Sequence, residues 1–298
     1  MNARVKNDEI GDNGFAGLED RTVASDVIAI ATQKGQPSMP QLKVGIHLPS
    51  LRVPLRQAVS LAAKLGADCL EIDARSQLKP GELSQTGLRQ FRKMLDDNGL
   101  RVCAIAFPTR RGYNDLDQLD ARVAGTKEAM QMAGTLGASV VVNHVGYIPP
   151  EPSGTDWDLL VQVLTDLGRH AQRVGAFLAA QTGTVGGEAL GKLVAALPDG
   201  SIGIDLDPGL LIVNGHDVQR AVELLAGHIM HVHATDGARD SARGRGVEVP
   251  LGRGSVDYPA LLGALEERGY RGAFTIRRDS SADPEFEIGQ AVKFLRSL

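Results

Sequence analysis

The chain has 298 residues, of which 43% are hydrophobic and 23% charged, and its formal net charge is −4. This balance is typical of a globular protein, and it provides no overall positive field to attract DNA or an anionic membrane. No apolar run reaches the roughly 18 residues that a membrane span needs, and the first residues lack the pattern of a secretory signal. We therefore expect a cytoplasmic protein that binds neither nucleic acid nor membrane.

The first forty residues differ from the rest of the chain. They are polar, they contain several glycines, and their one apolar run, "DVIAIA", is too short to fold alone. We therefore expect residues 1–40 to form a disordered N-terminal extension and residues 41–298 to form one folded domain.

After residue 41, short apolar runs alternate with longer amphipathic segments, several of which end at a glycine. The eight short runs cover residues 42–48, 68–74, 100–107, 139–145, 176–181, 201–207, 229–235 and 272–277. Such runs are typical of parallel strands buried on both faces. The pattern predicts an α/β fold, a (β/α)8 TIM barrel. A doubly wound open sheet is the alternative, but it normally has fewer units, and no Gly-x-Gly-x-x-Gly motif follows the first run.

The two cysteines, Cys69 and Cys103, each lie inside an apolar run. Two cysteines without close spacing do not favour a disulfide framework or a metal site. We expect two reduced thiols in the core.

Polar side chains gather where the predicted strands end, which is where a TIM barrel carries its chemistry. They are His47, Glu71, Asp73, Asn143, His144, Gln181, Asp205, Asp207, His231, His233, Asp236 and Arg277. His231 and His233 share one strand face, as do Asp205 and Asp207, because side chains alternate along a strand. A His and an Asp on neighbouring strands predict a hydrogen-bonded pair or part of a metal site. A structural polar layer that caps the barrel is the alternative.

The segment 238–255 follows the seventh predicted strand and contains Arg239, Arg243, Arg245 and Arg253. In TIM barrels the loops after the seventh and eighth strands often hold an anion. The segment therefore predicts a flexible lid over a phosphate, a carboxylate or a polyol. A solvated loop is the alternative.

Five segments together resemble the xylose isomerase-like TIM barrels, and the sugar phosphate isomerase/epimerase group among them. They are "AAQTG", "IDLDPGLLIVNGHD", "HVHATD", "EVPLGRGSVDYPALLGALEERGYRGAFTIRRD" and "DPEFEIGQAVKFLRSL". The superfamily also contains the family 2 apurinic endonucleases, whose multi-metal cluster and basic surface do not suit this acidic chain. The resemblance runs in order over residues 42–298.

The resemblance implies one divalent metal held by Glu, Asp, His and Glu, at positions that here carry Gln181, Asp207, His233 and Arg277. Arginine has no lone pair to donate, and an amide oxygen is a weaker ligand than a carboxylate. We therefore expect these four residues to be the catalytic set without a metal cofactor. The hypothesis is that Arg277 occupies the metal position and pairs with Asp207. Binding of Mn, Mg or Zn through Asp207 and His233 is the alternative.

The resemblance implies isomerisation or epimerisation of a polyhydroxylated carbonyl compound by proton transfer. Five further residues are expected to contact the small sugar or anionic substrate: Glu71, His144, Asp236, Arg245 and Glu248. The missing glutamates favour a second reading, a catalytically inactive barrel that binds a sugar or anion. The sequence leaves a homo-oligomer open.

Overall fold

The computed structural model of the protein describes residues 42–82, 84–240 and 246–298. The prediction for residues 1–40 lies outside this part of the chain. Residues 42–298 form one compact unit. None of the helices in the described part is long and apolar enough to cross a membrane.

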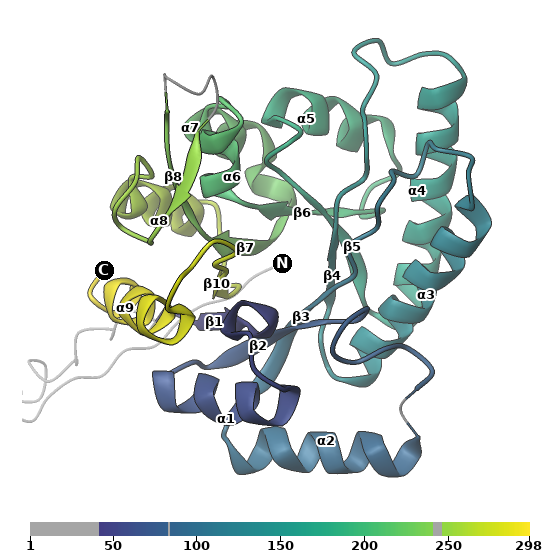
Figure 1. Cartoon of the computed structure of the whole chain (residues 1–298). Helices are drawn as coiled ribbons and strands as arrows, with labels where there is room; N and C mark the ends of the chain where they lie inside the picture. Colours follow the sequence, from purple (N-terminus) through teal and green to yellow (C-terminus); the bar gives the residue numbers. More distant parts are fainter. Residues whose placement is uncertain (1–41, 83, 241–245) are drawn as a thin grey trace, which may run out of the picture. The chain divides into compact units, whose positions relative to one another are not determined.

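Eight parallel strands pair in the order β1-β10-β7-β6-β5-β4-β3-β2 and close into a barrel (Figure 1). They are β1 (Val44–His47), β2 (Cys69–Asp73), β3 (Arg101–Ala106), β4 (Val140–Asn143), β5 (Phe177–Gln181), β6 (Gly203–Leu206), β7 (Ile229–Ala234) and β10 (Phe274–Ile276). Because β1 pairs with both β2 and β10, the sheet has no free edge. The predicted TIM barrel is confirmed, with each strand inside the run that predicted it.

Helices connect the strands and cover the outside of the barrel (Figure 1). They are α1 (Leu55–Leu65), α2 (Gln85–Asp97), α3 (Leu119–Thr135), α4 (Thr155–Val174), α5 (Gly187–Ala196), α6 (Pro208–Val213), α7 (Val218–Leu225), α8 (Tyr258–Glu267) and α9 (Pro284–Arg296), with 3-10 turns η1 (Leu48–Leu51) and η2 (Ala226–His228). Helix α1 stops at Gly66, whose φ of 91° is a left-handed conformation that glycine adopts without strain.

Three elements are absent from the sequence-based prediction, a helix and the two strands of a hairpin. Helix α6 begins directly after β6, where the Asp207 side chain caps it by accepting from the Leu210 amide. Strands β8 (Asp236–Ala238) and β9 (Val247–Val249) pair as an antiparallel hairpin inside the segment expected to be a flexible lid. The part of that segment that contains Arg243 and Arg245 lies outside the described residues.

The apolar residues form two layers. The larger cluster lies between the strands and the surrounding helices. A smaller cluster consists of Ala104, Val140, Val142 and Ala179, with Met230 packed against it. Its side chains are short, so this cluster fills little volume.

Candidate active site

The carboxyl ends of the strands meet at one end of the barrel, which we call the mouth and define by His47, Glu71, Gln181, Asp207 and Arg277. The structure brings the four predicted catalytic residues together there. Gln181 Nε2 donates to Asp207 Oδ2 at 3.3 Å, and Arg277 Nη1 lies 3.4 Å from the same oxygen. Burial raises the pKa of Asp207 above its usual value, against the opposing positive charges of Arg277 and His233.

Three hydrogen bonds and one ion pair surround the Asp207 carboxylate. Its Oδ1 accepts from the Leu210 amide at 2.9 Å and from Thr235 Oγ1 at 2.5 Å, and its Oδ2 faces Gln181 and Arg277. The carboxylate is fully buried. These four contacts match the four lone-pair positions of a carboxylate. A fifth partner would have to displace one of them.

Arg277 is the cation that reaches the mouth. Its side chain is 17% exposed, and besides Asp207 it binds Asp279 Oδ2 through Nε at 3.1 Å and Nη2 at 2.8 Å. Burial disfavours the guanidinium charge, but Asp207 and Asp279 outweigh this effect and raise the pKa of Arg277. Arg277 therefore keeps a permanent charge between two carboxylates.

Behind Arg277, a chain of buried hydrogen bonds crosses the interior of the barrel. His233 Nε2 lies 2.7 Å from Glu71 Oε2, and His233 Nδ1 lies 2.7 Å from Asp205 Oδ2. Asp205 Oδ1 is 2.8 Å from His231 Nδ1, and His231 Nε2 is 2.8 Å from Thr275 Oγ1. All five groups are at most 2% exposed. The sequence predicted the pairing of His and Asp between neighbouring strands, and the structure adds Glu71 and Thr275.

The chain of bonds determines the protonation of both imidazoles. Burial lowers the pKa of His233, but the adjacent Asp205 and Glu71 outweigh it and hold this pKa well above its usual value. For His231, the hydrogen bond to Asp205 overcomes burial and raises the pKa to about 9. His233 is thus an imidazolium that donates to a carboxylate from each ring nitrogen. Three carboxylates (Glu71, Asp205, Asp207) balance three cations (His231, His233, Arg277).

Glu71 and His47 differ from their neighbours because each retains an unused group. Glu71 Oε1 is buried and has no hydrogen-bond partner among the described residues. His47 Nδ1 lies 2.9 Å from Ser50 Oγ, which leaves its Nε2 free of any partner in the same part of the chain. Burial, reinforced by the charges of Arg277 and His233 and opposed by Glu71, lowers the pKa of His47 to about 4. At neutral pH His47 is therefore a neutral imidazole beside a carboxylate oxygen that lacks a donor.

Asp236 and His144 were expected to bind substrate, and both are engaged elsewhere. Asp236 is 1% exposed and accepts backbone N–H groups from Gly237, Gly252, Gly254 and Val256. It fixes the loop after β9 to the end of β7. His144 Nε2 contacts the Thr109 carbonyl on the loop after β3.

Glu248, also expected to bind substrate, holds the loop after β10 in place. It accepts from the amides of Asp279 and Ser280 at 3.0 and 2.9 Å and lies 2.8 Å from Arg278 Nη1. Arg278 also binds Glu287 at 2.7 Å. This cluster positions the segment that carries Arg277. Arg245, the last of the expected residues, lies outside the described part of the chain.

The residues present do not fit a divalent metal at the position that the resemblance implies. Both nitrogens of His233 carry hydrogen bonds to carboxylates, the Asp207 oxygens are saturated, and Arg277 offers no lone pair. A second set, Asp205, His231 and His233, has ligand atoms within 4.8 Å of one another. In that set the two imidazole Nδ1 atoms already face the two oxygens of Asp205, so a metal would first have to displace both contacts.

The comparisons with known proteins concern the fold and the family. A family model described as a xylose isomerase-like TIM barrel matches residues 59–298. A xylose isomerase domain protein from Planctomyces limnophilus has a TM-score of 0.77 and 26% identity, covering 87% of this chain and 97% of that one. A comparison with curated proteins found no match.

Two further solved structures share the fold at lower identity. A xylose isomerase-like TIM barrel protein from Mycobacterium smegmatis, in complex with magnesium, has a TM-score of 0.68 at 18% identity and covers 86% of this chain and 95% of that one. A sugar phosphate isomerase/epimerase from Parabacteroides distasonis has a TM-score of 0.66 at 15% identity, with coverage of 90% and 98%. The resemblance found in the sequence is confirmed: the chain belongs to the xylose isomerase-like TIM barrel family.

Proposed function

We propose that the protein is an isomerase or epimerase that moves a proton beside the carbonyl group of a polyhydroxylated substrate, without a divalent metal. The observation that carries the proposal is the Arg277–Asp207 contact of 3.4 Å, at the two strand ends where the family pattern implies a metal and its carboxylate. The family's known members include sugar phosphate isomerases/epimerases such as the P. distasonis protein. Family and site together support this class of reaction.

Charge supports the absence of a metal. The buried carboxylates of the site are already balanced by His231, His233 and Arg277. A divalent ion placed near 4 Å from Arg277 would meet a repulsion of about 4 kcal/mol per unit of charge at an effective dielectric of 20. The guanidinium then supplies the positive field that the metal would supply in a relative.

The roles of individual residues follow from which polar atoms are exposed or lack a hydrogen-bond partner. Arg277 is the partly exposed cation, so it stabilises the oxyanion that develops on the substrate carbonyl. Glu71 Oε1 is the carboxylate oxygen without a donor, and it accepts the proton or a substrate hydroxyl. His47, neutral and with a free Nε2, donates or relays a proton. The lowered pKa of Glu71, caused by His233 against burial, makes it a weak base, so we expect slow turnover.

Deuterium exchange tests the proposal. A panel of ketoses, aldoses, their phosphates and keto acids is incubated with the protein in D2O, and incorporation next to the carbonyl is followed by NMR. We expect exchange with at least one compound, unchanged after treatment with a chelator. Arg277→Met should lower its rate by roughly 10²- to 10³-fold, the usual cost of losing one oxyanion donor. The matched control is Arg268→Met, an exposed arginine at the end of α8. Absence of exchange with every compound, or loss of activity on chelation, would contradict the proposal.

A second candidate is a barrel that binds a sugar or anion without turnover. The saturated contacts of Asp207 and His233 favour it, because neither group is free to exchange a proton. Thermal shift with the same panel separates the two functions. A ligand that raises the melting temperature without exchange supports the binding protein, and one that does both supports the enzyme.

A further inference from the structure

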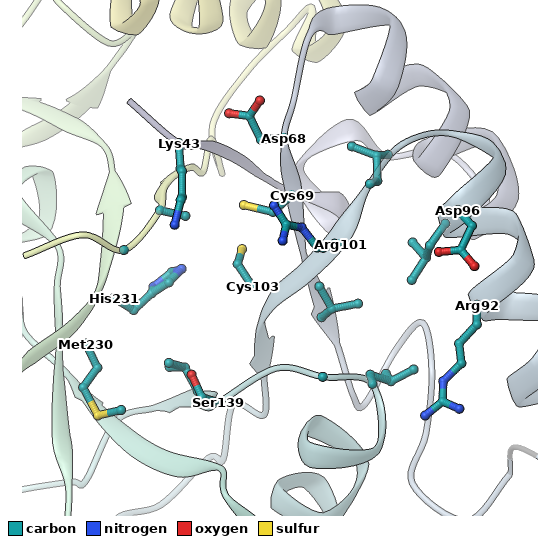
Figure 2. Close-up of a pocket in the computed structure, with 18 residues that line it drawn as sticks. Lys43, Asp68, Cys69, Arg92, Asp96, Arg101, Cys103, Ser139, Met230 and His231 are labelled. Carbon is teal, nitrogen blue, oxygen red and sulfur yellow. The ribbon is translucent and has the colours of Figure 1, made fainter. Parts of the chain in front are cut away.

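A cavity of about 500 Å³ lies at the opposite end of the barrel, where the strands begin (Figure 2). We call this end the floor and define it by the cavity residues Lys43, Cys69, Arg101, Cys103 and His231. Cys69 and Arg101 are the first residues of β2 and β3. The floor lies at the other end of the strands from the mouth, and His231 is the floor residue that also belongs to the buried chain of hydrogen bonds.

Both cysteines of the chain line this cavity. Their meeting depends on Gly45, which lies in register between Cys69 on β2 and Thr275 on β10. A Cβ on Gly45 would lie 3.3 Å from Cys69 Sγ and 2.6 Å from Thr275 Oγ1. Thr275 Oγ1 is in turn 3.6 Å from Cys103 Sγ. The missing side chain therefore lets the two thiols gather around one hydroxyl.

Neither cysteine forms a disulfide. Contact with the Cys69 thiol and burial raise the pKa of Cys103 well above its usual value, against the influence of His231. Protonated thiols are poor nucleophiles, so attack on a peroxide or a disulfide is slow. A metal ion acts differently, because it displaces the thiol protons as it binds.

The strand register also distinguishes a disulfide from a metal bridge. Cys69 is the register partner of Arg101, and the irregularity between Leu70 and Glu71 places Cys103 about one and a half residues further along. With a rise of about 3.3 Å per residue and strands about 4.8 Å apart, the two Cα atoms are roughly 7 Å apart. That separation is at the outer limit for a disulfide. Two metal–sulfur bonds of about 2.3 Å each span a wider gap between the sulfurs.

We propose that Cys69 Sγ and Cys103 Sγ together bind one thiophilic monovalent ion of the copper(I) or silver(I) class. Thiolate ligands select such ions. On binding, each thiol releases its proton and the ion forms two metal–sulfur bonds, which gives a bis-thiolate of net charge −1. No oxidation or reduction takes place.

The charged side chains of the cavity are Lys43, Arg92 and Arg101 against Asp68 and Asp96, and this excess of positive charge favours the negative product. Arg101 has no hydrogen bond or ion pair from its side chain among the described residues, and Lys43 Nζ makes a single 3.4 Å contact with the Arg271 carbonyl in the same part of the chain. Figure 2 shows both side chains at the cavity with the thiols. A monovalent ion leaves one negative charge to pair with them, whereas a divalent ion would leave none.

Titration of the full chain with copper(I), in the presence of a competing chelator and read by native mass spectrometry, tests the site. We expect one ion per chain, with X-ray absorption showing copper bound to two sulfur atoms. Cys69→Ser and Cys103→Ser should each abolish binding under the same conditions. Ser139→Ala, which changes a cavity residue without removing a thiol, should bind like the parent protein.

Three outcomes would overturn the proposal. They are two ions per chain, binding retained by either cysteine variant, and copper coordinated without two sulfurs in the parent protein. The last does not depend on whether the variants fold. The result is also separate from the proton-exchange assay, because the exchange reaction takes place at the mouth.

Discussion

The two ends of this barrel differ in how their charged side chains are paired. At the mouth, buried charges are matched one to one, and Asp207, Asp205 and His233 have every polar atom engaged. At the floor a cavity remains, and Lys43 and Arg101 have no carboxylate within ion-pair distance among the described residues. The contrast indicates that side chains of the protein supply the positive charge at the mouth, whereas the floor can bind a charged ligand.

The largest loss of stability is expected from replacing Asp205, which lies between the two buried imidazoles. Asp205→Asn removes the carboxylate that both imidazoles share, which leaves the buried His231 without a carboxylate partner and His233 with Glu71 alone. We expect the free energy of unfolding to fall by about 3–5 kcal/mol in urea denaturation. The control is Asp97→Asn, which removes an exposed pair with Lys93 and should change the free energy of unfolding little, because solvent screens such a pair. Equal losses of stability in the two variants would contradict the expected difference between the buried and the exposed charges.

Two glutamates introduced at the mouth should allow it to bind a divalent metal. The double variant Gln181→Glu/Arg277→Glu carries the Glu, Asp, His, Glu pattern that the family resemblance implies. We expect it to bind one Mn²⁺ per chain by calorimetry and to gain about 2.7 kcal/mol of stability at a metal concentration 100 times its Kd. The parent protein should show neither effect. Failure of the variant to bind metal would mean that more than Arg277 and Gln181 excludes the ion.

Filling the space at the floor should cost less. Gly45→Ala places a Cβ 2.6 Å from Thr275 Oγ1 and 3.3 Å from Cys69 Sγ, so both side chains must move. We expect a loss of about 1–3 kcal/mol in thermal or urea unfolding, as for other overpacked cores. Gly263→Ala, on helix α8 with open space around it, is the matched control and should be neutral or slightly stabilising. Similar stability of the two variants would show that the thiols are not tightly held.

The smallest effect is a change of stability with pH. His231 and His233 have folded pKa values above the unfolded value near 6.5, so their contribution is complete below that pH and is lost as pH rises, for His231 through about 9. His47 has a folded pKa of about 4, so stability falls as pH drops from about 6.5 to 4. Urea midpoints should therefore be highest near pH 6.5 and fall on both sides. His231→Gln should make the fall of the urea midpoint above pH 6.5 less steep. An unchanged pH dependence in this range would contradict the raised pKa of His231.

The sequence was sufficient for the barrel, because eight apolar runs separated by amphipathic segments specify strand count and order. The strand-end rule gathered the polar residues at one end of the barrel, and the family resemblance supplied the hypothesis that Arg277 pairs with Asp207, which lie 3.4 Å apart. It could not foresee the role of Asp236 or Glu248, because their contacts with backbone amides depend on how the loops after β7 and β10 fold. The hairpin β8–β9 was missed for the same reason, since its two strands are three residues each.

Two site features were beyond the reach of sequence patterns for a different reason. That Glu71 faces His233 across the barrel, 162 positions apart, depends on closure of the sheet. The free Nε2 of His47 emerges only when the loop carrying Ser50 is placed against it. For Cys69 and Cys103 the sequence predicted reduced core thiols, and the structure adds that they share a cavity.

The central claim is that cationic side chains, and not a divalent ion, supply the positive charge at the mouth. The most direct measurement is ¹⁵N NMR of the histidine rings at pH 7.5, with His233 assigned by comparison with His233→Gln. The account predicts that both ring nitrogens of His233 are protonated, as its two carboxylate partners require. An unprotonated His233 nitrogen whose resonance changes on removal of a bound metal would contradict the account.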